Sequence, residues 1–360
     1  MTKKSKLLKP DTKKSVVTYV MLIAVFAVVT VLLQAGKVSY MIKDLLVPLC
    51  VYAIMAVSLN LTVGILGELS LGQAGFMCIG AYSGALFSNL FEEAIPQMLI
   101  RFPVAMILGG ACAALFGILI GIPVLRLRGD YLAIVTLAFG EIIKNICASV
   151  YLGRDAEGFH ISLKSMSDMN MAADGEMLIN GPLGLNGTPR DSSFTIAFIV
   201  LFITTVIAYN FVNSRTGRAV MSIRDNRIAA ESVGINITKY KLITFALTAF
   251  FAGVAGAIYS HNFSTLQASK FDYNLSILVL VFVVLGGIGS IRGSIIAAVV
   301  LTLIPELLRE TIGNYRMLFY AVILIVMMIF TSNPVIKSKL NAYTAKLKGL
   351  VVKEKKGEIK

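Results

Sequence analysis

Long apolar runs separated by short polar segments dominate this sequence. Each run is long enough for a helix to cross the hydrocarbon core of a bilayer. The pattern therefore predicts an all-α protein, a polytopic transmembrane helical bundle of about ten spans. Glycines crowd the segments 64–70 and 286–293, which leaves open a broken or re-entrant helix at each. The predicted spans are 16–34, 44–63, 71–90, 103–125, 131–151, 193–212, 242–260, 273–289, 293–311 and 317–333.

Composition and charge agree with a membrane protein. Only 15% of the 360 residues are charged and the mean hydropathy is +0.80, whereas soluble domains have about 25% charged residues. Most Lys and Arg residues fall in the tails and alternate polar segments, and cytoplasmic segments of membrane proteins are enriched in these residues. We therefore expect both termini to be cytoplasmic. The net charge of +13 then needs no nucleic-acid partner, and contact with anionic membrane lipids is a minor addition.

The same pattern gives the predicted organisation of the chain. A transmembrane domain, 15–334, lies between two basic cytoplasmic tails, 1–14 and 335–360. Its two long polar segments are an outer loop, 152–191, and a cytoplasmic loop, 213–241. The outer loop is acidic and rich in turn residues. It is either a solvated connection or a seat for an extracytoplasmic binding protein, and we favour the seat because a connection rarely needs this length.

The cytoplasmic loop carries a candidate short helix. Ser222 and Asp225 have the spacing of a helix start, and Gly234 can end the helix. About two turns of helix are too short to be stable without a partner surface. Ala229 and Ala230 would give this helix a small-residue face for a neighbour. A basic turn of ordinary topology is the alternative.

Charged pairs inside two spans are candidates for the translocation path. Glu141 and Lys144 share one helix face, and Glu306 and Arg309 repeat this spacing just after Pro305. Charges at this depth should face the bundle or a wet cavity. They form either internal ion pairs that fix helix packing, which we favour, or polar lining for a zwitterionic solute.

The sequence lacks motifs for nucleotide binding, metal binding and disulfide bonds. The chain has no G-x-x-x-x-G-K-[ST] phosphate loop, so any ATP used must be bound by another polypeptide. The four cysteines have no metal or disulfide spacing, and the two histidines are far apart. We expect no enzyme, cofactor or metal site in this chain.

Five motifs resemble those of the permease subunits of branched-chain amino-acid ABC importers, in the same order along the chain. The family's cytoplasmic coupling segment is matched by Thr216-Gly-Arg-Ala followed by Arg224-Asp-Asn-x-x-Ala-Ala-Glu-Ser-x-Gly-Ile235. The late glycine motif has Arg292 where many relatives have Trp. The other matching blocks are Gly67–Tyr82, Arg128–Glu141, Gly181–Pro189 and the glycine motif itself, Leu285–Ser294.

The resemblance implies an importer permease in the inner membrane of a prokaryote. Its partners would be a second related permease subunit, two ABC ATPase subunits and an extracytoplasmic binding protein. Its substrates would be branched-chain or other hydrophobic amino acids, with urea, amides or nucleosides as alternatives. A stand-alone ion-coupled secondary transporter is the alternative from another class. The residues that the resemblance assigns to ATPase coupling are Arg224, Asp225, Asn226, Ala229, Ala230, Glu231 and Gly234.

Overall fold

The computed structural model of the chain describes residues 10–36, 39–127, 129–155, 158–164, 169, 175–312, 321–322 and 325. Two compact units, 1–299 and 300–360, divide the chain. In the second unit, residues 300–312 continue a helix that begins at Ile291. The predicted span 317–333 lies almost entirely outside the described residues.

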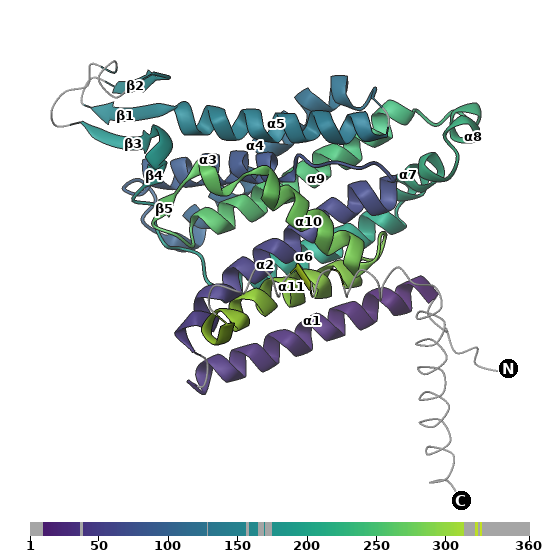
Figure 1. Cartoon of the computed structure of the whole chain (residues 1–360), viewed down its shortest axis with the longest axis horizontal. Helices are drawn as coiled ribbons and strands as arrows, with labels where there is room; N and C mark the ends of the chain where they lie inside the picture. The colour runs from purple at the N-terminus through teal and green to yellow at the C-terminus, as the bar shows by residue number, and fades with distance from the viewer. Residues whose placement is uncertain are drawn as a thin grey trace, which may run out of the picture. The chain divides into compact units, whose positions relative to one another are not determined.

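The described residues are mainly helical, as predicted (Figure 1). Within the part of the chain that the structure describes, seven helical stretches are long and apolar enough to cross a membrane: Ser15–Gln34, Ile42–Leu66, Met98–Val124, Asp130–Ser149, Phe194–Asn213, Ile237–Ser260 and Ala268–Gly286. The predicted spans 71–90 and 293–311 are also helical, but neither is among these seven. The count of ten spans stays a prediction. The helices are α1 (Pro10–Gln34), α2 (Tyr40–Asn60), α3 (Gln73–Leu90), α4 (Met98–Val124), α5 (Asp130–Ser149), α6 (Phe194–Asn213), α7 (Arg215–Asp225), α8 (Arg227–Ser232), α9 (Ile237–Ser260), α10 (Tyr273–Gly286) and α11 (Ile291–Ile312), with short 3₁₀ turns at Gly181–Leu183 and Ala268–Lys270.

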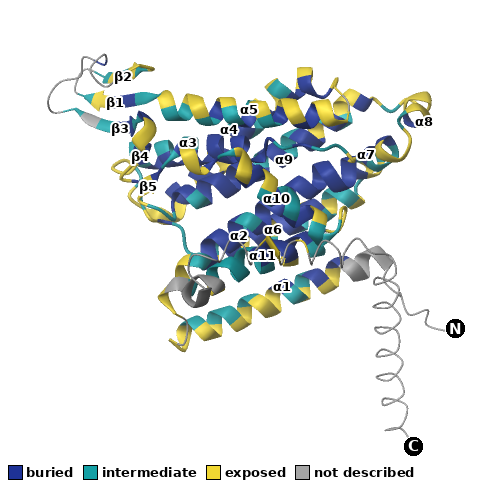
Figure 2. Ribbon diagram, in the orientation of Figure 1, coloured by how far each residue is buried: buried dark blue, intermediate teal, exposed yellow. Residues whose placement is uncertain are grey.

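Helix α9 lies at the centre of the first unit, against α2, α3 and α4 (Figure 2). Small residues allow this close packing. A Cβ built on Gly80 of α3 would come within 2.1 Å of the Gly253 carbonyl oxygen of α9, and one on Gly253 would meet Ala113 of α4 at 2.5 Å. Close approach through small residues is how helices associate in lipid, where burial of apolar surface gives no advantage.

Both predicted breaks interrupt the helices. After α2 the chain forms a turn of π-helix, Leu61–Leu66, which ends at Gly67 with φ +79°. Residues 67–72 are then non-helical, and α3 begins at Gln73. The second break separates α10 from α11, where Gly287 and Gly289 both have positive φ. We call residues 61–72 the α2–α3 break below.

A small antiparallel sheet corrects the all-α prediction. Its strand order is β2-β1-β3-β4-β5, and four of the five strands come from the predicted outer loop. The fifth comes from the connection between α9 and α10, so two segments far apart in the sequence share one sheet. This sheet and the α7–α8 segment lie at opposite ends of the helical bundle (Figure 1). The strands are β1 (Tyr151–Asp155), β2 (Gly158–Ser162), β3 (Glu176–Asn180), β4 (Leu185–Asn186) and β5 (Thr265–Leu266).

Candidate coupling site

The predicted cytoplasmic loop folds into two helices, each started by a side-chain cap. The Ser214 hydroxyl accepts the amide of Gly217 at 3.0 Å to start α7, and Asn226 Oδ1 accepts the amide of Ala229 at 3.0 Å to start α8. The prediction of one helix starting near Ser222 is wrong. The extended backbone of Asn226, with φ −155°, ends α7 and caps α8 at the same residue.

Helix α8 ends at Gly234, as predicted. Gly234 has φ +83°, its amide donates to Glu231 O at 3.0 Å, and the amide of Ile235 donates to Ala230 O at 3.1 Å. This bond pattern is a Schellman motif, which needs a left-handed residue at the position of Gly234. Caps at both ends therefore fix a helix of only six residues.

Ala229 and Ala230 do not form one common face for a neighbour. Ala230 is 3% exposed and packs with Ile223 and Ile237 in a small apolar cluster. Its side chain therefore holds α8 against α7 and α9 of the same chain, whereas Ala229 is exposed. The small side chain of Ala230 therefore allows close packing within the chain.

Part of the uncovered surface at α8 is apolar. Ile228 is 82% exposed and Val233 is 75% exposed, and the exposed Ala229 lies beside them in the sequence. All three lie outside the seven candidate membrane spans. Large apolar side chains without cover on a capped, positioned helix are typical of a protein–protein contact. We call Ile228, Ala229 and Val233 the docking face.

Arg224 connects α7 to the α2–α3 break. Its Nη1 donates to the Gly64 carbonyl at 2.9 Å, and its Nη2 lies 3.0 Å from Asp225 Oδ1. A Cβ on Gly67 would lie 2.6 Å from Arg224 Cγ, so the stem of the arginine occupies the space that a side chain would need. Arg224 thus contacts the bundle directly, whereas Asp225 is exposed and contacts Arg224.

A second connection runs from the break to the start of α9. The Lys241 ammonium forms an ion pair with the Glu68 carboxylate, and Lys241 is 4% exposed. The other carboxylate oxygen of Glu68 is buried without a hydrogen-bond partner. Lys241 therefore supplies most of the compensation for this buried charge, and removal of either partner would leave the other one uncompensated.

The two helix breaks contact each other. The amide of Gly289 donates to Asn60 Oδ1 at 2.8 Å, and Asn60 Nδ2 donates to Ser294 Oγ at 2.9 Å. A Cβ on Gly64 would lie 2.4 Å from Gly289 N. Beside this contact is a cavity of about 340 Å³, lined by Ile65, Tyr209, Val212 and 289–292. The two segments that were predicted to break a helix, 64–70 and 286–293, therefore lie together and are joined by polar contacts.

The candidate pair on α5 is an ion pair. Lys144 Nζ contacts Glu141 Oε2, and Glu141 Oε1 accepts the amide of Tyr273 at 2.8 Å at the start of α10. Both side chains are partly exposed. Because Glu141 also binds a helix N-terminus, the structure favours the packing role for this pair. For the second candidate pair, Glu306 lies half-buried in α11 and the side chain of Arg309 is outside the described residues.

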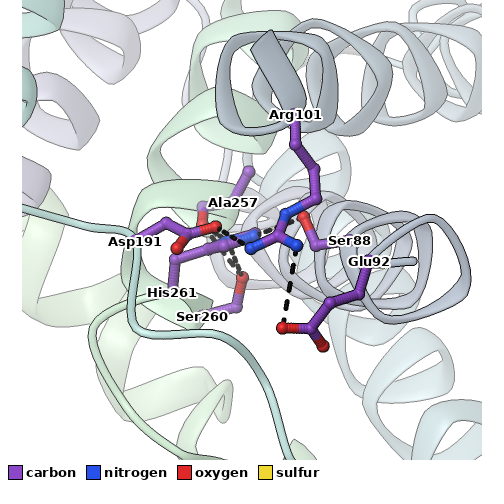
Figure 3. A network of polar contacts seen from close by, with 7 residues as sticks. All are labelled: Ser88, Glu92, Arg101, Asp191, Ala257, Ser260 and His261. Atoms are coloured by element: carbon purple, nitrogen blue, oxygen red, sulfur yellow. Dashed lines mark hydrogen bonds and ion pairs between the residues drawn. The ribbon is translucent and has the colours of Figure 1, made fainter. Parts of the chain in front are cut away.

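A buried polar network at the end of the bundle near the sheet was not predicted (Figure 3). Arg101, in the first turn of α4 and 4% exposed, donates to Asp191 Oδ2 at 2.7 Å and lies 3.7 Å from Glu92. Beside it, the fully buried His261 contacts Ser88 Oγ through Nε2 at 2.7 Å. This network joins the ends of α3, α4 and α9 to the segment that leads from the sheet into α6.

The hydrogen bonds of His261 determine its tautomer. Nδ1 lies 2.7 Å from the Ala257 carbonyl, which can only accept. Nδ1 therefore carries the proton, and Nε2 accepts from the Ser88 hydroxyl. Burial lowers the pKa of His261 below 6.5, so the neutral ring is favoured at pH 7.

Glu68, Lys241, Arg101 and Asp191 are the important residues that the sequence analysis missed. Each of these four is a charged residue at or just beyond the end of an apolar run. From the sequence, that position indicates only where a span ends. Among the described residues, no group of three or more His, Cys, Asp or Glu side chains could hold a metal ion.

Comparisons with known proteins agree with the motifs. A family model described as the permease component of branched-chain amino acid transport systems matches residues 41–331. The chain is 32% identical to the high-affinity branched-chain amino acid transport system permease protein LivM of Salmonella typhimurium, over 83% of this chain and 71% of that protein. The Escherichia coli LivM is also 32% identical, over 78% of this chain and 66% of that protein.

A more distant relative has another substrate in its name. The nucleoside ABC transporter permease protein NupC of Lactococcus lactis is 24% identical, over 64% of this chain and 71% of that protein. No solved structure gives a significant match. The motifs, the apolar helices and the family match over most of the chain agree, and this chain belongs to the permease components of branched-chain amino acid transport systems.

Proposed function

We propose that this chain translocates branched-chain or other hydrophobic amino acids delivered by an extracytoplasmic binding protein. Two separate ABC ATPase subunits would bind and hydrolyse the ATP, and a second, related permease subunit would complete the pathway. The docking face on α8 carries this proposal, because two exposed apolar side chains outside the candidate spans need a soluble partner.

The proposed topology has ten spans and two cytoplasmic termini. The basic α7–α8 segment and the sheet lie at opposite ends of the bundle, which supports opposite sides of the membrane for them. With α7–α8 inside, the sheet faces the binding protein. Cysteine labelling from each side of the membrane, at Val233→Cys and Leu163→Cys, tests this orientation. Labelling of both positions from the same side would refute it.

Each residue of the coupling segment has a proposed role. Ile228, Ala229 and Val233 contact the ATPase, and the exposed Glu231 lies at the edge of that contact. The other coupling residues shape and hold the segment: Asn226 and Gly234 cap α8, Ala230 packs it, and Arg224 with Asp225 attaches it to the bundle.

The sheet is the proposed seat of the binding protein. β2 is an edge strand that pairs only with β1. Phe159, Ile161 and Leu163 alternate on and just after this strand, and they are 58%, 69% and 65% exposed. Alternate residues share one face of a strand, so these side chains form an uncovered apolar stripe. Serine at all three positions should abolish stimulation of ATPase activity by the binding protein and leave basal hydrolysis unchanged. Full stimulation would refute the seat.

Affinity purification of the tagged chain from its native membrane is the decisive experiment. We expect two ATPase chains, a second permease and a binding protein to co-purify, and ATP hydrolysis by the complex but not by the chain alone. Uptake of labelled leucine into proteoliposomes should require ATP. A chain that purifies alone and transports on an ion gradient would instead support the secondary transporter.

The named relatives keep a second substrate class open. The likeness to a nucleoside permease makes nucleosides the alternative with a specific observation behind it, whereas urea and amides rest on the motifs alone. Ligand extracted from the co-purified binding protein, identified by mass spectrometry, decides between a hydrophobic amino acid and a nucleoside.

A further inference from the structure

The α2–α3 break is held mainly by side chains of other elements. A π-helical turn and a non-helical stretch lack the regular bonds of an α-helix, and such irregular backbone within membrane proteins needs partners in the protein. We propose that Arg224 and the Glu68–Lys241 pair fasten this break to α7 and α9, and that the fastening carries movement of α8 into the bundle during transport. This inference rests on the proposed function.

Arg224 is well placed to transmit movement. It follows the buried Ile223 and lies two residues before Asn226, the residue that separates α7 from α8. Its Nη1 reaches the Gly64 carbonyl at 2.9 Å, inside the π-helical turn. A charged donor on a backbone carbonyl is among the stronger hydrogen bonds. The docking face is thus only a few residues from a direct bond to the break.

The Glu68–Lys241 pair gives the second attachment. α9 begins at Ile237, three residues after Gly234 ends α8, and Lys241 lies in the first turns of α9. Thr62 and Thr248 add a hydroxyl contact at 2.9 Å between the break and α9. Residues 62–68 of the break are therefore attached to both helices that flank α8.

The end of the break and the first turn of α3 are attached to different helices. The amide of Leu71 donates to Thr136 Oγ1 of α5 at 2.9 Å, and the amide of Ala74 in α3 donates to Ser276 Oγ of α10 at 3.0 Å. A displacement of residues 62–68 relative to residues 71–74 would move α7 and α9 against α5 and α10. An element held between two groups of helices can respond in this way to a partner that binds only one of them.

A charge-swap experiment tests the Glu68–Lys241 pair. The complex is purified and reconstituted, and molecules of labelled leucine transported are counted per ATP hydrolysed. Glu68→Lys and Lys241→Glu should each lower this ratio by roughly twofold to thirtyfold, the range for mutations that disturb coupling. The double swap restores opposite charges and should recover most of the ratio. Equal ratios in the wild type and both single variants would overturn the proposal, as would a double swap no better than the singles.

Arg224→Met removes the donor to Gly64 and keeps an aliphatic stem against Gly67. It should lower the ratio while ATPase co-purification persists, because the docking face is unchanged. Arg215→Met is the matched control, since Arg215 is exposed at the start of α7, and it should keep the wild-type ratio. Loss of co-purification with Arg224→Met, or an unchanged ratio, would contradict the transmission role.

Misfolding and failure of the proposed function give different results. Membrane abundance and thermal stability are measured for each variant, and Glu68→Gln replaces any charge reversal that does not accumulate, with the same expected loss of ratio. If the wild-type complex shows no ATP-dependent leucine uptake, the proposed function is wrong. If the wild-type complex shows this uptake and every variant has the wild-type ratio of leucine to ATP, only the proposed role of Arg224 and the Glu68–Lys241 pair is wrong.

Discussion

Truncation of Ile228 to alanine tests the docking face most directly. In the chain itself this side chain is 82% exposed, so its removal should change the stability of the permease little. Burial against an ATPase subunit would remove its three outer carbons from water, and Ile228→Ala should then weaken association by about 2.4 kcal/mol, at about 0.8 kcal/mol for each carbon. This loss corresponds to about a sixtyfold higher Kd.

The assay is titration of the purified permease, in detergent, with the ATPase subunit that co-purifies with it. Ile107→Ala is the matched control, because Ile107 is 62% exposed on α4 within a candidate span and should leave the Kd unchanged. An unchanged Kd for Ile228→Ala, with normal uptake, would show that α8 is only a basic turn. Ala230→Glu cannot serve for this test, since it would bury a carboxylate in the permease's own cluster and destabilise the segment.

Three further predictions concern the bundle. Gly80→Ala should lower the unfolding temperature, because overpacking against Gly253 costs about 1–3 kcal/mol, whereas a Cβ on Gly140 has its nearest contact at 3.7 Å and Gly140→Ala should not lower it. Glu141→Gln should destabilise the chain, and adding Lys144→Met should recover part of the loss; uptake that collapses at unchanged stability would instead favour a pathway role. For His261, the unfolded chain binds a proton near pH 6.5 and the folded chain only at lower pH. Thermal stability should therefore fall as the pH drops below about 6.5, and a His261→Gln variant with the same fall would refute this assignment.

Most helices could be predicted from apolar runs, but two span starts were placed too late for the same reason. α4 begins at Met98 rather than 103, and α9 begins at Ile237 rather than 242, because Arg101 and Lys241 were interpreted as lying outside the membrane. Each is paired in the fold with an acid far away in the sequence, at Asp191 and Glu68. A charge can enter a helix end when its partner is buried beside it, and a single sequence does not show that partner.

The candidate site was predicted in part. Gly234 was identified correctly as the end of the coupling helix because only its backbone conformation mattered. The helix start was predicted at Ser222 instead of Asn226, since both residues carry good local capping signals and only packing decides between them. Ala230 packs within the chain and not against a partner as predicted, because a small side chain indicates close packing but does not identify the neighbour. The two-residue strands β4 and β5 are too short for any alternation to show.

The central position of α9 has a consequence for biogenesis. The helices that surround it, α2, α3 and α4, are all made earlier. Gly80, Gly84 and Gly109 therefore lack their neighbours on α9, and the Glu68 carboxylate lacks Lys241, until α9 has been made. Thr62 likewise lacks Thr248 until that point. The core of the first unit is thus completed late in synthesis, and α10 and the first residues of α11 are added after it.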